Sequence, residues 1–131
     1  MKIQVRSVNN ATIIDCVGEV DLYSAPNLRD TLTKEMHSGT SSVLINMSEV
    51  SYIDSSGIAT LVEGLQLSRQ TRTRFGLFGL RGNARSVLEL ARLQKVFAIF
   101  ADEQEALQRI SSTEPFGGLK TPTLPDPRRG A

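Results

Sequence analysis

Apolar and polar positions follow two different periods along the chain, and the period predicts whether each stretch is a strand or a helix. Two short apolar stretches within residues 1–20 are separated by Asn9-Asn10, a pair typical of tight hairpin turns, and they predict two antiparallel strands. Between Ser24 and Gly39 a leucine or methionine recurs at every fourth position, with mostly polar residues in between. This spacing predicts an amphipathic helix that begins at Ser24 as its N-cap and ends before Gly39.

From residue 42 onward the pattern alternates between strands and helices. An apolar run at 42–47 predicts a central strand that is apolar on both faces, and a run of helical period predicts a helix after Asp54. The remaining predicted elements are a strand at 74–80, a helix capped by Asn83, a strand at 95–100 and a helix over 101–110. The order β-β-α-β-α-β-α-β-α predicts the α/β class, with a small mixed β-sheet, largely parallel, flanked by four helices.

The composition of the chain changes near residue 113. Four of the five prolines lie after this point, among glycines and without an apolar period. Such a composition is typical of segments that do not pack into a core. We therefore expect one folded domain over residues 1–112, a length that suits a single domain, and a Pro/Gly-rich disordered tail over 113–131.

The charge and the sparse cysteine and histidine content exclude several classes of function. The chain has 15 Lys and Arg and 14 Asp and Glu, which gives a net charge of +1. This balance lacks the excess of basic residues that is typical of proteins that bind nucleic acid directly. The single cysteine, Cys16, precludes an intramolecular disulfide, and Cys16 with the single histidine, His37, cannot form a Cys/His zinc cluster. We expect Cys16 to be buried in a strand and His37 to cap a helix C-terminus. No apolar run has the length of a signal peptide or a membrane span, so we expect a cytoplasmic protein without membrane, metal or cofactor.

The segment Asp54-Ser55-Ser56-Gly57 lies where the chain is predicted to enter a helix. An aspartate and a serine there can accept hydrogen bonds from the unpaired N–H groups of the first turn, and a glycine lets the backbone turn tightly. Helix capping accounts for one hydroxyl but does not require a second. Because a helix N-terminus also stabilises anions, a phosphate on a serine there would be held by backbone N–H groups. The segment therefore fits either a plain helix cap or a phosphorylation site.

Longer motifs around this segment carry a resemblance to a known family. GEVDLYSAPNLRDTL, followed about thirty residues later by VSYIDSSGIATL, resembles the STAS-domain anti-sigma factor antagonists, and ARLQKVFAIF resembles the late helix and strand of that family. The similarity spans roughly residues 3–110. It implies a single STAS domain, a small β-sheet flanked by helices, which agrees with the predicted order of elements. It also implies a regulatory binding protein rather than an enzyme.

The resemblance implies a mechanism called partner switching, which regulates transcription through protein contacts. The unphosphorylated antagonist binds an anti-sigma factor that is also a serine kinase, and binding frees a sigma factor. Phosphorylation by this kinase ends the binding, and a serine phosphatase restores it. The modified residue of the family directly follows the Asp of the motif, so Ser55 is the expected acceptor and Ser56 the less favoured one. Asp54 and Gly57 match the motif as they stand, and Asp21 matches an acidic residue near the modified serine.

Several alternatives remain open. One is a STAS-type scaffold or transporter accessory subunit that binds protein partners without a phosphorylated serine. Another is a serine hydrolase, which needs a base beside its nucleophile; His37 is predicted at the far end of its helix, and the chain has no Gly-x-Ser-x-Gly motif. A third is a nucleotide- or lipid-binding module. The basic run with Arg69, Arg72 and Arg74 is expected to be a solvated helix end past the second helix.

Overall fold

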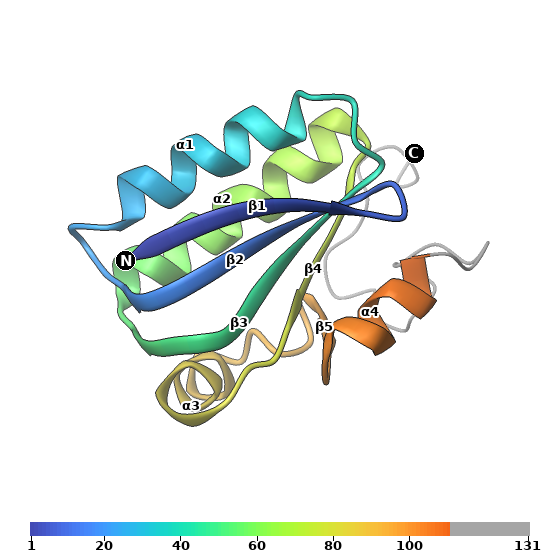
Figure 1. The fold of residues 1–131 in the computed structure, drawn as a ribbon. Helices are drawn as coiled ribbons and strands as arrows, with labels where there is room; N and C mark the ends of the chain where they lie inside the picture. The colour runs from blue at the N-terminus through green and yellow to red at the C-terminus, as the bar shows by residue number, and fades with distance from the viewer. Residues whose placement is uncertain (111–131) are drawn as a thin grey trace, which may run out of the picture.

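Residues 1–110, the part of the chain that the computed structural model describes, fold into one five-stranded sheet and four helices (Figure 1). The elements are β1 (Lys2–Val8), β2 (Ala11–Val20), α1 (Ala25–Met36), β3 (Ser42–Ile53), α2 (Ser55–Thr71), β4 (Arg74–Phe78), α3 (Gly82–Leu90), β5 (Ala98–Phe100) and α4 (Glu103–Ile110). Their order confirms the predicted arrangement and the α/β class. The expected tail at 113–131 lies outside the described residues.

The sheet is mixed, and its strands lie side by side in chain order, β1-β2-β3-β4-β5. β1 and β2 are antiparallel and joined by Asn9 and Asn10, whose φ angles of 51° and 68° are those of a tight hairpin turn. The other neighbouring pairs are parallel. β3 is central but extends beyond the predicted 42–47, because β2 pairs with it, through two register shifts, as far as Val20 opposite Ile53. The carboxyl ends of β2 and β3 therefore lie next to each other.

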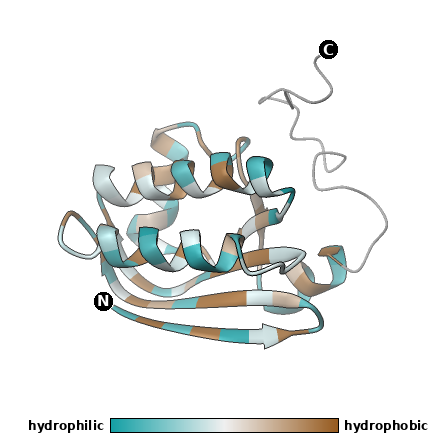
Figure 2. Cartoon of the chain, turned by 90° about the horizontal axis from the view of Figure 1, so that it is seen from above, coloured by the Kyte–Doolittle hydropathy of each residue, from teal (hydrophilic) through white to brown (hydrophobic). Residues whose placement is uncertain are grey.

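Helices cover the two faces of the sheet unequally. α1, α2 and α3 share the larger core cluster, to which they contribute Leu28, Leu61 and Leu88. α4 packs on the opposite face, where Ala106 is buried in a smaller cluster. Figure 1 shows α1 and α2 on one side of the sheet and α4 on the other, and Figure 2 shows α1 and α2 running side by side over the strands.

The single-residue predictions for Cys16 and His37 are confirmed by the structure. Cys16 is buried in β2, and burial raises the pKa of its thiol to about 12. Phe97 and Phe100 belong to the two core clusters. His37 is the C-cap of α1, and its Nδ1 lies 2.8 Å from the carbonyl oxygen of Thr33. The same carbonyl also accepts the backbone N–H of His37 at 3.3 Å, so the ring adds a second contact at the helix end.

Of the two other predicted N-caps, Asn83 is wrong and Ser24 is right in position. α3 begins at Gly82 with Arg81 as its N-cap, so Asn83 lies inside the first turn instead of capping it. The side chain of Asn83 is used elsewhere, since its Oδ1 accepts the N–H of Ile53 at 2.9 Å. Ser24 does occupy the N-cap position of α1, but it makes no capping bond. Its hydroxyl instead accepts the N–H of Asp21 at 2.9 Å and stabilises the loop between β2 and α1.

The basic run is not a solvated helix end as a whole. Arg69 lies in the last turn of α2, and Arg72 is its C-cap with a left-handed φ of 56°. After this residue the chain turns at once into β4, so Arg74 is a half-buried strand residue. Its guanidinium donates a hydrogen bond to the carbonyl of Ile110 at 3.0 Å and thereby ties β4 to the end of α4.

Candidate functional site

Asp54 joins two segments at the carboxyl ends of β2 and β3. It is the N-cap of α2, as the sequence predicts, and its backbone is extended. Its Oδ1 accepts the N–H groups of Ser56 at 2.9 Å and Gly57 at 3.1 Å. Its Oδ2 accepts the N–H of Leu22 at 3.2 Å. One carboxylate thus fixes the first turn of α2 to the loop between β2 and α1.

Ser55 is the first residue of α2, and its side chain is exposed to solvent. Among the hydrogen bonds of the described residues, none involves its hydroxyl. Ser56, in contrast, is half-buried, and its carbonyl oxygen accepts a hydrogen bond from the hydroxyl of Thr60 at 2.9 Å. The arrangement therefore offers the hydroxyl of Ser55, more readily than that of Ser56, to an enzyme that approaches from solvent.

The occupied cap changes how a phosphate on Ser55 would be bound. From the sequence we expected backbone N–H groups at the start of the helix to hold it. In the structure two of these donors, the N–H groups of Ser56 and Gly57, already bond to Asp54. A phosphate next to this carboxylate would compete with it for the same donors, and the two anions would repel each other. The expectation of free donors is thus wrong for these two groups.

Gly57 is required for space rather than for an unusual backbone conformation. Its φ is not among the positive φ angles of the described glycines. A Cβ atom placed on it would lie 2.5 Å from the carbonyl oxygen of Val20 and 2.5 Å from Cγ1 of Ile53. Both distances are shorter than non-bonded contacts allow. The absence of a side chain at Gly57 therefore lets the first turn of α2 rest on the ends of β2 and β3.

Asp21 stabilises the loop beside the site through hydrogen bonds to its backbone. Its Oδ1 accepts the N–H groups of Tyr23 at 3.0 Å and Ser24 at 3.1 Å. These bonds, the one from the Ser24 backbone first among them, lower the pKa of the Asp21 carboxyl. No hydrogen bond links Asp21 to Ser55 within residues 1–110. The structure thus places Asp21 next to Leu22, the loop residue that Asp54 holds.

Sequence reasoning missed two features of the site. Leu22 and Tyr23, in the loop that Asp54 and Asp21 hold, are 64% and 90% exposed, the values of side chains that pack on almost nothing. The sequence could have predicted their exposure, because two large apolar residues lie between Asp21 and Ser24, which are typical of turns at the surface. The second feature is the Asn83 bond to Ile53, which links the start of α3 to the residue before Asp54.

The geometry gives no support to a serine hydrolase. His37 caps the C-terminus of α1, whereas the loop beside Ser55 precedes its N-terminus, and a helix of 12 residues separates them by about 18 Å. No group of His, Cys, Asp and Glu suited to a metal ion occurs among the described residues. None of the helices between residues 1 and 110 has the length and hydropathy to span a membrane.

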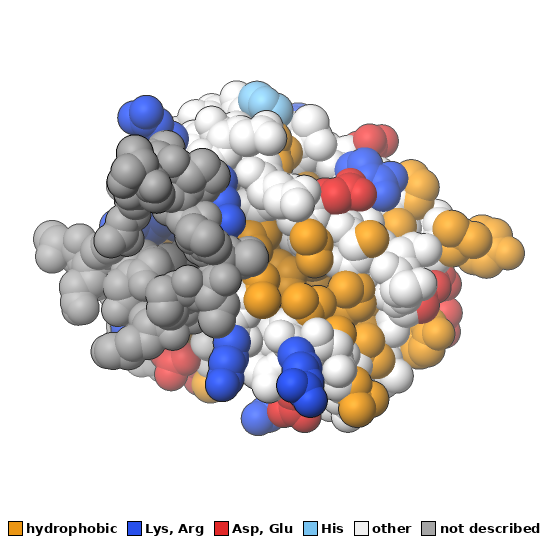
Figure 3. Space-filling model, turned by 180° about the vertical axis from the view of Figure 1, so that it is seen from behind, with side chains coloured by type: hydrophobic (Ala, Val, Ile, Leu, Met, Phe, Trp, Pro, Cys, Tyr) orange, Lys and Arg blue, Asp and Glu red, His pale blue; other side chains and the backbone are white. Residues whose placement is uncertain are grey.

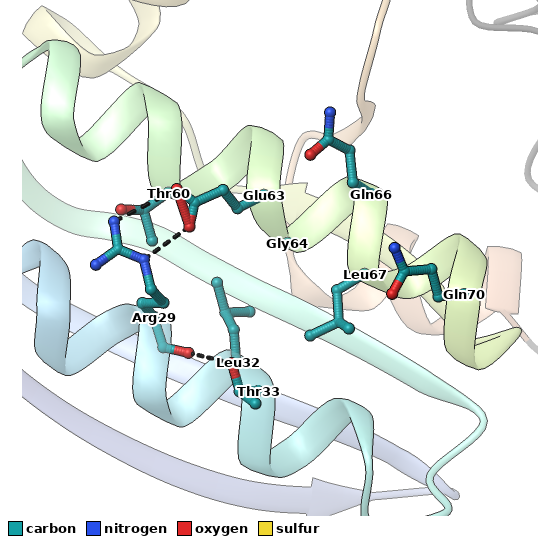
Figure 4. Close-up of a pocket in the computed structure, with 9 residues that line it drawn as sticks. All are labelled: Arg29, Leu32, Thr33, Thr60, Glu63, Gly64, Gln66, Leu67 and Gln70. Carbon is teal, nitrogen blue, oxygen red and sulfur yellow. Dashed lines mark hydrogen bonds and ion pairs between the residues drawn. The ribbon is translucent and has the colours of Figure 1, made fainter.

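A pocket of about 220 Å³ lies between α1 and α2 rather than at Ser55 (Figure 4). Its lining combines polar residues, among them Thr33 and Gln70, with the apolar Leu32 and Leu67. An ion pair between Arg29 and Glu63, with 2.7 Å between Nε and Oε1, connects the two helices at this pocket. Both partners are about half exposed, so this pair contributes little stability. The pocket adds no reactive group to the site.

A family model settles the classification. The model of the STAS domain matches residues 2–106. The chain belongs to the STAS domain family. The match spans every strand and the first turn of α4, so the described fold is that of a STAS domain.

Individual relatives of this STAS domain are named as regulators. The anti-sigma-B factor antagonist of Staphylococcus aureus (strain NCTC 8325 / PS 47) is 28% identical over 82 residues, which cover 63% of this chain and 76% of the relative. An anti-sigma factor antagonist from Mycobacterium paratuberculosis shares the fold with a TM-score of 0.77 at 23% identity, over 85% of this chain and 94% of that chain. The Bacillus cell fate determinant SpoIIAA in its phosphorylated form shares it with a TM-score of 0.66 at 22% identity, over 83% and 99%.

Proposed function

We propose that this STAS domain is an anti-sigma factor antagonist that works by partner switching. In its unphosphorylated form it binds an anti-sigma factor that is also a serine kinase, and binding releases a sigma factor in the cytoplasm. Phosphorylation of Ser55 ends the binding, and a serine phosphatase restores it. The observation that carries the proposal is the exposed hydroxyl of Ser55 at the start of α2, beside a carboxylate that also holds the β2–α1 loop.

The switch acts through charge. The surface around Ser55 loses its water when the partner binds, and a phosphate there opposes this loss. Phosphorylation adds about two negative charges at Ser55. Asp54 and Asp21 already place carboxylates nearby, and neither has a cationic partner among the four ion pairs of the described residues. A partner surface fitted to a hydroxyl would then face an unpaired dianion. Such a mismatch costs several kcal/mol, and about 3 kcal/mol weakens binding by more than about a hundredfold.

A STAS-type scaffold or transporter accessory subunit remains the second candidate. Such a protein would bind partners through the same fold but would need no acceptor serine. The exposed hydroxyl of Ser55 and its position next to Asp54 favour the switch over this candidate. The two differ in one measurable property, since only the antagonist loses its partner when Ser55 is phosphorylated.

The deciding experiment mixes the purified protein with each anti-sigma factor kinase of the source organism. Calorimetry without ATP measures binding, and mass spectrometry after addition of Mg²⁺ and ATP maps the modified residue. We expect one kinase to bind, to phosphorylate Ser55 and then to dissociate. Ser55→Ala should bind and stay bound when ATP is added, and Ser56→Ala, the matched control, should behave like the wild type. Modification of Ser56 alone, or a complex that persists after Ser55 is phosphorylated, would contradict the proposal.

A further inference from the structure

Leu22 and Tyr23, here called the apolar tip, are two adjacent large hydrophobic residues in the β2–α1 loop, and Asp54 accepts the N–H of Leu22. They are 64% and 90% exposed and belong to neither core cluster. Figure 3 shows other hydrophobic side chains gathered at the centre of one face. Ile58, Val62 and Val87 are hydrophobic residues of α2 and α3. Those side chains are half-buried and pack against the core. Leu22 and Tyr23 are thus two adjacent large hydrophobic side chains that leave most of their surface in solvent, where a partner can bury it.

The apolar tip is held in place by a dense set of hydrogen bonds. The N–H of Leu22 bonds to Asp54, and the N–H of Tyr23 bonds to Asp21. The hydroxyl of Ser24 accepts the N–H of Asp21 and donates to the carbonyl of Glu19 at 2.8 Å. A loop whose backbone donors are satisfied in this way loses little conformational entropy when it binds. Such preorganisation lowers the entropic cost of docking on a partner.

Asp54 also fixes the distance between the apolar tip and Ser55. The same carboxylate bonds to Leu22 with one oxygen and to the first turn of α2 with the other. A partner that covers the hydroxyl of Ser55 therefore meets Leu22 and Tyr23 in a constant arrangement. The apolar tip is continuous with the surface that carries the acceptor serine.

We infer that the apolar tip is the anchor by which the anti-sigma factor docks, an inference that rests on the proposed function. The anti-sigma factor presents an apolar pocket for Leu22 and Tyr23, rimmed by lysine or arginine. The rim is argued from charge, because Glu19 and Asp21 flank the apolar tip and neither takes part in an ion pair within residues 1–110. Tyrosine is among the residues that dominate binding energies at interfaces.

The same charges disfavour two other occupants. In a symmetric dimer a patch meets its own copy, so Glu19 and Asp21 would face the same carboxylates of the second chain. Against an anionic membrane the two carboxylates would be repelled by the lipid headgroups. A basic protein surface is the occupant that these charges complement.

The test uses the anti-sigma factor kinase that the wild-type protein binds in calorimetry without ATP. Leu22→Ser and Tyr23→Ser should each raise Kd by about tenfold or more, because each removes an apolar anchor. Leu90→Ser is the matched control, since Leu90 on α3 is 84% exposed but lies outside the loop that Asp54 holds, and its Kd should stay within about twofold of wild type. Glu19→Gln should reduce the salt dependence of binding, which reports the basic rim. All four side chains are exposed, and amide NMR spectra check that the variants keep the fold.

Each other result overturns the inference in its own way. If both tip variants bind with wild-type affinity, the apolar tip is not the docking anchor, but the proposed function is unaffected. An equal loss in Leu90→Ser shows that the effect is not specific to the tip. Sedimentation of the wild type as a dimer that Tyr23→Ser dissociates identifies a second copy as the occupant, and co-sedimentation with phosphatidylserine vesicles identifies a membrane. If the wild type binds no anti-sigma factor, the proposed function fails and the inference fails with it.

Discussion

The carboxylate of Asp54 accepts the N–H of Leu22 at 3.2 Å across 32 positions of the chain. This bond joins the start of α2 to the loop after β2, two segments that the sequence alone does not connect. Because the other oxygen of the same carboxylate caps α2, any change at Asp54 alters the helix start and the loop together. The site therefore behaves as one unit built around a single side chain.

Asp54→Ala should destabilise the protein and weaken binding of the anti-sigma factor. The loss of an N-cap costs about 1–2 kcal/mol, and the freed Leu22 N–H loosens the loop that carries the apolar tip. Asp102→Ala is the matched control, because Asp102 caps α4 by accepting the N–H of Glu105 at 2.9 Å on the opposite face of the sheet. Urea unfolding should show similar losses in both variants, whereas calorimetry should show weaker binding only for Asp54→Ala. If both variants bind the anti-sigma factor equally well, Asp54 acts as a helix cap and does not support the binding surface.

Phosphorylation of Ser55 should act locally and leave the sheet unchanged. The phosphate competes with Asp54 for the N–H groups of Ser56 and Gly57, so the amide NMR signals of these residues and of Leu22 should move most. The signal of Ala106, on the buried side of α4, should not move. Ser55→Asp adds one charge instead of about two and should lose only part of the binding affinity. Shifts spread across all five strands would instead indicate a conformational switch.

Gly57→Ala should destabilise the protein by about 1–3 kcal/mol, because its Cβ would overlap a backbone carbonyl that cannot move without distorting β2. Gly64→Ala is the control within the same helix. Its Cβ would lie 3.1 Å from the ends of Leu32 and Phe75, which are side-chain atoms that can shift, and alanine favours the helix. Thermal unfolding should rank Gly57→Ala clearly below Gly64→Ala. The reverse order would show that the tight contact is not needed to seat α2.

Local chemistry made part of the site predictable from the sequence. An aspartate directly before a helical apolar pattern is a common N-cap, so Asp54 could be assigned without knowing the fold. The partners of Leu22 and Asn83 lie about thirty residues away, and only the pairing of β2 with β3 and the packing of α3 bring them together. The reason for Gly57 also depends on packing, because the atom that excludes a side chain belongs to Val20.

The fold was easier to predict than its element ends. The spacing of hydrophobic residues reflects which face of an element is buried, so it predicts the type of element well. Every strand and helix predicted from this spacing is present in the structure. The ends depend on hydrogen bonds to distant segments. β3 runs on to Ile53 because β2 offers a pairing edge, and Ser24 fails to cap α1 because its hydroxyl is used inside the loop.

Arg6 on β1 links Asp15 on β2 to Glu103 on α4, and this cluster should make the docking of α4 sensitive to acid. Nε of Arg6 lies 2.6 Å from Oδ2 of Asp15, and Nη2 lies 2.7 Å from Oε1 of Glu103. Asp15 also accepts a hydrogen bond from the amide of Asn46 at 2.8 Å. The bond from Arg6 is the main reason that the pKa of Asp15 is lowered, with burial acting against it.

The sign of the pH effect follows from this lowered pKa. Asp15 binds a proton more readily in the unfolded chain than in the folded one, so its contribution to stability is present above about pH 4 and is lost as the pH falls through the folded pKa. Asp15→Asn should therefore cost about 1–2 kcal/mol at neutral pH and flatten the acid limb of a stability curve measured by urea unfolding. Glu63→Gln, which breaks the exposed pair with Arg29, is the control and should change both quantities little. An acid limb in Asp15→Asn as steep as that of the wild type would assign the acid sensitivity to other carboxylates.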